Sequence, residues 1–254
     1  MRRLSLTSWS VHHSLTDGSL TLLDLPARMR EEGLGTLEIC HFHFPSTDDD
    51  YIASLKSALA AANVESFSIL IDTGDISSAD PEQRAKDLQT VKNWIDVASK
   101  LGSQVVRVVA GNSDPNDKEA LKRSIAGLEE AANYAKAKGV KVLTENFMAL
   151  ASTAENCNAI LDALDGKVGL CADIGNFPSD IRVASFSAVV GRASVVHTKA
   201  SYNEAGELNA EQLRACLQAS VDAGFDGPYT LVYDRDANSW PRLAELKAVV
   251  SDYL

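Results

Sequence analysis

The chain of 254 residues carries a net charge of −11, and 45% of its residues are hydrophobic. This length suits one large α/β domain, and the hydrophobic content is enough for a sizeable core. The negative charge argues against a nucleic-acid partner, since proteins that bind a phosphate backbone usually carry a basic face.

The cysteines show no close pairing such as CxxC; they are Cys40, Cys157, Cys171 and Cys216. Isolated thiols of this kind are typical of small buried hydrophobes in a reducing compartment. The basic N-terminus is not followed by a long apolar segment, and no window approaches the length of a transmembrane helix. We therefore expect a cytoplasmic protein with no membrane partner.

Apolar runs rich in β-branched residues alternate along the chain with apolar residues at helical spacing. The runs predict strands over 4–11, 36–40, 66–72, 104–110, 140–147, 168–173, 194–199 and 228–233. The helical patterns predict helices over 20–32, 48–63, 81–101, 118–138, 153–164, 181–190, 209–223 and 240–253.

These strand-then-helix units, about eight with short connections, predict a (β/α)₈ TIM barrel. No linker or second composition regime interrupts them, so we expect one domain over residues 1–254. The competing architecture is a doubly wound open sheet. It rarely needs eight regular units, and no GxGxxG motif follows the first strand.

Three of the predicted strands end on a side chain that can bind a metal. Glu145, Asp173 and His197 lie at the ends of the fifth, sixth and seventh strands. The C-terminal ends of the strands form one face of a parallel barrel, so the three side chains are expected to converge. Each has an ordinary alternative, as a solvated loop residue or a hydrogen-bonded core residue.

Two carboxylates and one imidazole suit Mg²⁺, Mn²⁺, Co²⁺ or Zn²⁺ as a divalent cofactor, and the sequence does not choose among these ions. A metal open to substrate polarises a carbonyl and stabilises an enediolate. A carboxylate beside it can move the proton next to that carbonyl. We name Glu145 and Lys199 as catalytic candidates.

The same strand ends resemble the sugar phosphate isomerase/epimerase family, the xylose isomerase-like barrels related to the AP endonuclease superfamily. The segments that carry the resemblance are 7–10, 33–39, 144–147, 173–177, 196–199 and 224–228. They cover nearly the whole chain. They are specific for the superfamily but give little information about the substrate.

In that family four side chains hold the metal, and the resemblance carries three of them over to Glu145, Asp173 and His197. The fourth, a glutamate from strand eight, falls on Val232. Asp234 lies on the same face one step nearer the rim, either as a replacement ligand or as a loop residue. Family epimerases use the glutamates of strands five and eight on opposite faces of the sugar. Because Val232 stands at the position of the strand-eight glutamate, the chain lacks one of these two bases.

Further residues are expected to bind substrate around the metal: Trp9, Glu38, His41, Arg107, Asn146 and Asn176. Arg107 and Lys199 suit a phosphate or carboxylate, although an ion pair with Asp72 or Glu145 accounts for either equally well. His41 either binds hydroxyls or packs the barrel mouth. Trp9 either forms an apolar wall for a sugar or belongs to the core.

The resemblance implies a metal-dependent isomerase or epimerase that moves a proton between adjacent carbons of a sugar or sugar phosphate. A non-catalytic sugar-binding barrel is the alternative that Val232 and Ala200 favour, because many family members carry acids at these positions. An endonuclease IV-like hydrolase ranks lower, since the chain has only 5 histidines and an acidic charge. Family members often form dimers or tetramers, so a homo-oligomer stays open.

Overall fold

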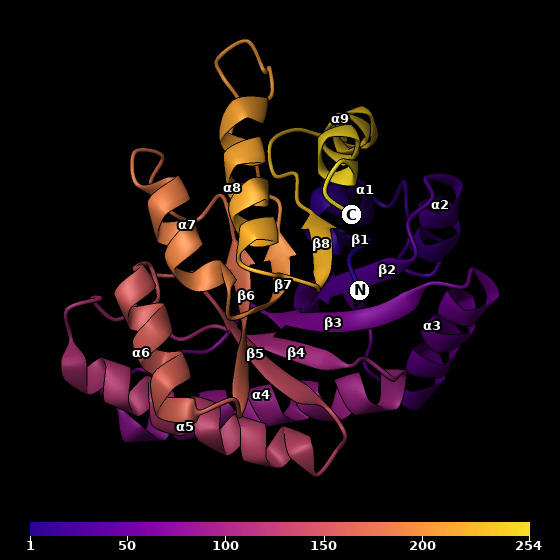
Figure 1. Cartoon of the computed structure of the whole chain (residues 1–254). Coiled ribbons are helices and arrows are strands. Elements are labelled where there is room, and N and C mark those ends of the chain that lie inside the picture. The colour runs from indigo at the N-terminus through magenta and orange to yellow at the C-terminus, as the bar shows by residue number, and fades with distance from the viewer.

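The computed structural model describes residues 1–254 and contains eight parallel strands that close into a barrel (Figure 1). The strands are β1 (Arg3–Thr7), β2 (Thr36–Cys40), β3 (Glu65–Ile71), β4 (Val105–Val108), β5 (Lys141–Glu145), β6 (Val168–Asp173), β7 (Ala193–His197) and β8 (Pro228–Leu231). Each strand pairs with its neighbour in sequence, and β8 pairs with β1. The predicted TIM barrel is therefore confirmed.

Helices surround the barrel on its outer side (Figure 1). They are α1 (His12–Asp17), α2 (Leu25–Glu31), α3 (Asp49–Ala61), α4 (Pro81–Leu101), α5 (Lys118–Lys136), α6 (Ala154–Leu164), α7 (Arg182–Val190), α8 (Ala210–Asp222) and α9 (Ser239–Ser251). Two short 3₁₀ helices, η1 (Ser8–Val11) and η2 (His41–His43), follow β1 and β2 directly. None of the helices combines the length and the hydropathy that a membrane span requires.

Side-chain caps explain where several of these helices begin. Asp48, Asp80 and Asp117 precede α3, α4 and α5, and the carboxylate of each accepts a hydrogen bond from the first turn of its helix. Such a cap satisfies a backbone N–H that has no partner within the helix. Gly102 ends α4 in the left-handed conformation, with φ of 88°, which glycine adopts without strain.

The first predicted strand is too long. The sequence predicts a strand over 4–11, but β1 ends at Thr7. The hydroxyl of Thr7 accepts a hydrogen bond from the backbone N–H of Trp9 at 3.3 Å and so begins η1. The helix predicted over 20–32 is also too long. The observed helix α2 begins only at Leu25, with Pro26 in its first turn.

Two hydrophobic clusters hold the structure together. The larger contains 58 buried residues, most of them between the barrel and the helices. The smaller fills the barrel interior beside β3 to β7 and consists of Phe67, Val105, Leu143, Cys171 and Val195. The interior beside β8, β1 and β2 is polar instead, with Ser5, Glu38 and Thr230 fully buried.

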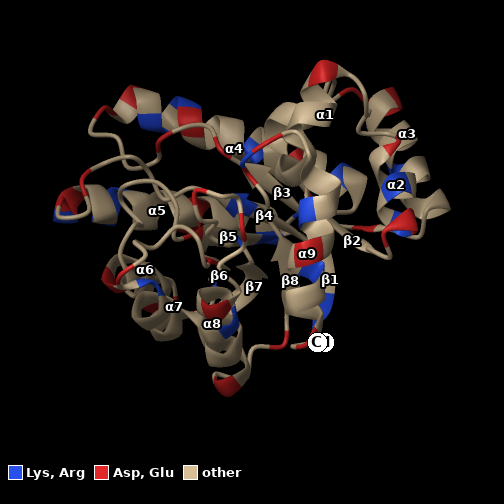
Figure 2. Cartoon of the chain, turned by 90° about the horizontal axis from the view of Figure 1, so that it is seen from above, with Lys and Arg blue, Asp and Glu red and all other residues tan.

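Acidic and basic residues are interspersed along the outer helices when the barrel is seen from above (Figure 2). Many of them form exposed ion pairs, such as Lys92 with Glu130 and Arg192 with Asp162, each 2.7 Å apart. Pairs of this kind contribute little to stability because water screens them. The charges that matter for function lie inside the barrel mouth.

Candidate active site

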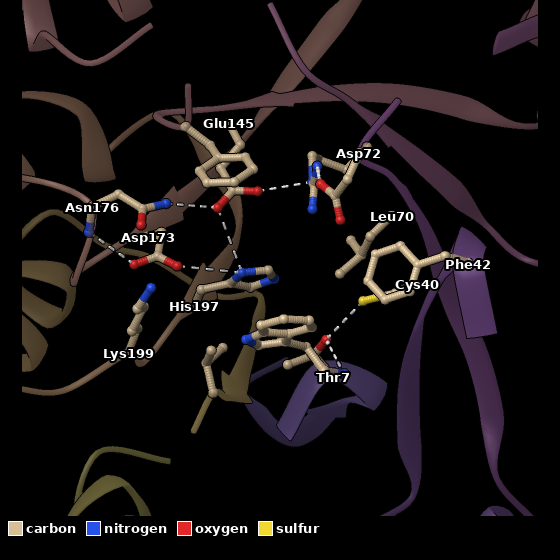
Figure 3. A pocket seen from close by; sticks show the side chains of 14 residues that line it. Thr7, Cys40, Phe42, Leu70, Asp72, Glu145, Asp173, Asn176, His197 and Lys199 are labelled. Atoms are coloured by element: carbon tan, nitrogen blue, oxygen red, sulfur yellow. Dashed lines mark hydrogen bonds and ion pairs between the residues drawn. The ribbon is translucent and has the colours of Figure 1, made fainter. Parts of the chain in front are cut away.

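A cavity of about 250 Å³ opens at the C-terminal ends of the strands (Figure 3). Every strand of the barrel, or the residues directly after it, contributes to its lining. This is the face of a parallel barrel on which ligands bind, because loop residues and strand ends meet there.

Glu145, Asp173 and His197 converge in this cavity from β5, β6 and β7 (Figure 3). Nδ1 of His197 lies 3.8 Å from Oε1 of Glu145 and 3.7 Å from Oδ2 of Asp173. All three residues are buried. The distances are too long for hydrogen bonds, so Nδ1 of His197 faces both carboxylates without bonding either of them.

Hydrogen bonds orient the carboxylate of Asp173. Its Oδ1 accepts from the backbone N–H groups of Gly175 at 2.6 Å and Asn176 at 3.2 Å, which leaves Oδ2 facing His197. The side chain of Asn146 bonds the main chain of Asp173 twice, donating to its carbonyl and accepting from its N–H. Asp173 is therefore fixed from both sides before any ligand binds.

Glu145 is held by two different neighbours. Its Oε1 accepts a hydrogen bond from Nδ2 of Asn176 at 3.0 Å. Its Oε2 lies 2.8 Å from Nε of Arg107, close enough for an ion pair but without the alignment of a hydrogen bond. Burial raises the pKa of Glu145, and the positive charge of Arg107 only partly opposes this effect. A carboxylate with a raised pKa is better able to accept a proton.

Arg107 also pairs with Asp72 through Nη1. Burial has the largest effect on the pKa of Asp72 and by itself would raise it, but the charge and hydrogen bond of Arg107, together with His41 and His197, lower it. The guanidinium carbon of Arg107 lies 5.7 Å from the centre of the Phe147 ring. The guanidinium thus joins two carboxylates at the inner end of the cavity, and the ion pairs expected as an alternative role are present.

His197 contacts a third carboxylate, that of Glu38 in β2. Nε2 of His197 lies 3.3 Å from Oε1 of Glu38. Burial alone would lower the pKa of His197, but Cys171, Glu38 and Asp173 around it raise the pKa well above its usual value. The raised pKa shows that these groups attract positive charge to this point. With Nε2 of His197 beside Glu38, Nδ1 of His197 and the two carboxylate oxygens that face it form a set of donor atoms that suits a divalent cation.

Lys199 follows His197 and lies at the rim of the site. Its Nζ is 2.6 Å from Oδ2 of Asp234. Burial tends to lower the pKa of Lys199, but Asp173 and Asp234 raise it, so the ammonium stays charged. Gly175 makes room for this side chain, since a Cβ on Gly175 would come within 2.5 Å of Cγ of Lys199. Asp234 bonds to Lys199 and does not line the cavity, whereas Val232 does.

Three residues that the sequence predicts as substrate-binding lie outside the cavity lining: Glu38, His41 and Asn146. Glu38 is fully buried below His197, and Asn146 bonds the main chain of Asp173. Nδ1 of His41 accepts a hydrogen bond from the backbone N–H of Asp72 at 3.2 Å. Each side chain therefore already has a protein partner. The other three predicted substrate-binding residues line the cavity: Trp9, Arg107 and Asn176. The catalytic candidate Lys199 also lines it.

Sequence reasoning did not anticipate Cys171 near the site. Its Sγ lies within 4.8 Å of donor atoms of both Glu145 and His197. The signal was available, because Cys171 precedes Asp173 by two residues in β6 and so points to the same side of the sheet. Burial raises the pKa of this thiol, which therefore stays protonated.

The cavity has an uncharged half as well. Trp9 and Phe42 form its outer edge, with ring centres 6.0 Å apart at an angle of 89°. Both rings are partly exposed, at 37% and 44%. Such rings offer an apolar surface to a ligand that binds between them and the charged groups.

The family model for the "Xylose isomerase-like TIM barrel" matches residues 26–247 of the chain. Two solved structures share the architecture over almost the whole chain. The D-allulose 3-epimerase of Methylomonas sp. in complex with D-allulose has a TM-score of 0.74 and 18% identity, covering 100% of this chain and 98% of that one. The probable 3-DHS dehydratase AsbF of Bacillus anthracis has a TM-score of 0.77 and 16% identity, covering 98% of each chain. At these identities the likeness concerns the fold alone.

One curated relative is similar in sequence. The probable endonuclease 4 of Thermoplasma acidophilum is 27% identical over an alignment of 161 residues, and the match covers 58% of this chain and 54% of the relative. The chain therefore matches about half the length of that relative.

Proposed function

Because the chain belongs to the xylose isomerase-like TIM barrels, we propose that it is a metal-dependent isomerase or epimerase of a sugar or sugar phosphate. The observation that carries this proposal is that Glu145, Asp173 and His197 line one cavity, with Nδ1 of His197 facing both carboxylates. The D-allulose 3-epimerase with the same architecture supports a sugar as the ligand.

The metal would be held by Oε1 of Glu145, Oδ2 of Asp173 and Nδ1 of His197, which face one another unbonded. A divalent cation at this position supplies the charge that stabilises an enediolate. The set of two carboxylates and an imidazole accepts Mg²⁺, Mn²⁺, Co²⁺ or Zn²⁺. Asp234 remains a candidate fourth ligand only if it leaves Lys199.

The chain's own groups would carry the proton. Glu145 has a raised pKa and takes the proton from the carbon next to the carbonyl. Asn176 holds Oε1 of this carboxylate and fixes its direction. Lys199 is charged and borders the cavity, so its ammonium donates to a substrate oxygen or binds a phosphate.

A non-catalytic sugar-binding barrel is the second candidate. It is supported by Val232, an uncharged side chain in the cavity at the position where family members carry their fourth ligand. An endonuclease IV-like activity has the support of the relative from Thermoplasma, but the match covers only about half of that protein. The net charge of −11 opposes binding to DNA.

Solvent-deuterium exchange tests the proposed activity. Purified protein with Mn²⁺ is incubated in D₂O with a panel of ketoses and ketose phosphates, and deuterium next to the carbonyl is measured by NMR. We expect exchange into at least one ketose, and a rate lower by about 100-fold or more for Glu145→Gln. Exchange in the variant at the wild-type rate would reject Glu145 as the base. A nicking assay on abasic DNA tests the endonuclease.

A further inference from the structure

The two halves of the cavity differ in their ability to transfer a proton. The half formed by β4 to β7 contains Arg107, Glu145, Asp173, His197 and Lys199. The opposite half comes from the ends of β8, β1, β2 and β3 and contains Val232, Thr7, Trp9, Cys40, Phe42 and Leu70. Asp72, directly after β3, also lines the cavity and pairs with Arg107 at the boundary between the two halves. Figure 3 shows Glu145, Asp173 and Lys199 on one side, and Thr7, Cys40 and Phe42 on the other, with Asp72 on the same side of the view as Leu70 and Phe42.

No group in the uncharged half acts as a base near neutral pH. Burial raises the pKa of Cys40 to about 12, and its thiol contacts the hydroxyl of Thr7. That hydroxyl accepts from the N–H of Trp9. Thr7 and Cys40 are therefore both engaged and both protonated, and the remaining side chains of this half are apolar or indole.

The titratable groups nearest to this half are engaged elsewhere. Asp72 pairs with Arg107, and Asp234 pairs with Lys199. His43 bonds Ser8 and His12 at 2.8 and 2.9 Å and does not line the cavity. None of them is free to approach a ligand from the side of Val232.

We infer that proton transfer occurs on one face of the substrate only, so that the enzyme isomerises a ketose to an aldose and does not invert a hydroxyl-bearing carbon. This inference rests on the proposed function and narrows it. An enediolate is planar, and inversion requires a proton to leave one face of the plane and to return on the other. In this cavity, only the face of the enediolate that is turned toward Glu145 lies against a group that can donate and accept a proton.

The proton balance of the isomerisation needs no further reactant. The C–H bond at C1 of the ketose breaks, its electron pair forms the C1–C2 double bond of the enediolate, and the proton passes to Glu145. The double bond then takes a proton back from the same carboxylate at C2. The O–H bond at O1 breaks as the carbonyl forms at C1, and this proton passes to O2 to complete the new hydroxyl. Since both transfers use one face, the aldose product has a single configuration at C2.

Product analysis in D₂O tests this inference. D-Allulose and D-fructose differ only at C3, so their interconversion reports inversion, whereas aldoses report isomerisation. The same panel includes D-tagatose, L-ribulose, D-xylulose and the ketose phosphates. With Mn²⁺-loaded wild-type protein we expect an aldose of one C2 configuration from at least one ketose, and no C3 epimer. Chromatography identifies the product, and NMR locates the deuterium.

A charge placed on the uncharged half provides a second readout. Val232→Glu supplies a carboxylate there, and Val232→Gln has the same size without the charge. We expect Val232→Glu to form C3 epimers at least about 100-fold faster than Val232→Gln, while thermal melting verifies that both variants fold. Epimers formed by Val232→Gln at the rate of Val232→Glu would count against the inference.

The possible failures are distinguishable. Wild-type protein that interconverts C3 epimers overturns the one-face inference and leaves the proposed function standing. An aldose mixture with both configurations at C2 has the same consequence. If no ketose of the panel gains deuterium, the proposed function and the inference both fall.

Discussion

The carboxylate of Glu38 lies against the imidazole of His197, with Oε1 3.3 Å from Nε2. The hydroxyl of Thr230 donates a hydrogen bond to the same oxygen of Glu38. A carboxylate at Nε2 favours a proton on that nitrogen, which leaves the lone pair of Nδ1 for the point shared with Glu145 and Asp173. Glu38 is thus a positioning residue that never touches the ligand.

Glu38→Gln tests this role. The substitution keeps the shape and the acceptor for Thr230 but removes the negative charge below His197. We expect the affinity for Mn²⁺ to fall by about 10- to 100-fold, as is usual when a carboxylate behind a ligand histidine is lost. Calorimetric titration with Mn²⁺ measures it. Thr230→Val is the control, with a smaller effect expected because it retains the charge. Unchanged affinity in Glu38→Gln would rule out the role.

Arg107→Met removes the partner of two buried carboxylates. The side chains of Glu145 and Asp72 are 4% and 20% exposed, so water screens neither charge fully once the guanidinium is gone. We expect the free energy of unfolding to fall by about 3–5 kcal/mol in urea titrations. Lys122→Met is the matched control, because Lys122 pairs with Glu119 on the surface, and its loss costs about 0–1 kcal/mol. Similar losses in both variants would contradict the role of Arg107.

His43 makes the stability of the protein depend on pH. Burial, followed by the nearby His12 and His41, lowers the pKa of His43 to about 4, while Asp72 opposes this. The unfolded chain binds a proton near pH 6.5 and the folded one only near pH 4. The stabilisation is therefore fully present above pH 6.5 and is lost as the pH falls toward 4.

The contribution of His43 should be about 2 kcal/mol, after discounting the shift for partial exposure of the ring. Urea titrations at pH 7 and pH 5 measure it, and His43→Gln should reduce the difference between the two pH values. Asp24→Asn, a change at an exposed surface carboxylate, is the control. A pH difference that is the same in His43→Gln and wild type would disprove the assignment.

Gly175→Ala tests the close approach of Lys199 to β6. An added Cβ would lie 2.8 Å from the backbone oxygen of Lys199 as well as 2.5 Å from its Cγ. We expect a loss of about 1–3 kcal/mol in unfolding free energy, together with lower exchange activity. Gly191→Ala is the control, because its Cβ would meet only Ala223 at an ordinary 3.7 Å. A Gly175→Ala variant as stable and active as Gly191→Ala would show that the space is not needed.

The fold followed from the sequence because local signals agree along the chain. Most strands are short apolar runs, and several helices have caps or stops, such as Asp80 and Gly102 of α4. The errors fall where a side chain overrides the pattern. The apolar pattern continues past Thr7, but the hydroxyl of Thr7 ends β1, and a hydroxyl is not a reliable strand stop on its own.

The site was predictable in part. Glu145, Asp173 and His197 stand out because each ends a buried strand. Glu38 and Asn146 carry the same residue types, but their partners lie on other strands far along the chain. Only the register of the closed barrel places Glu38 below His197, and a pattern in one segment does not contain that information.

The number of Mn²⁺ ions bound per chain tests the central claim most directly. Electron paramagnetic resonance of wild-type protein titrated with Mn²⁺, compared with Asp173→Asn and His197→Gln, measures it without any assumption about the substrate. We predict one tightly bound ion per wild-type chain, and an affinity lower by about 10-fold or more in each variant. Wild-type protein without a stoichiometric ion, or variants that bind Mn²⁺ as tightly as wild type, would contradict a metal site formed by these residues.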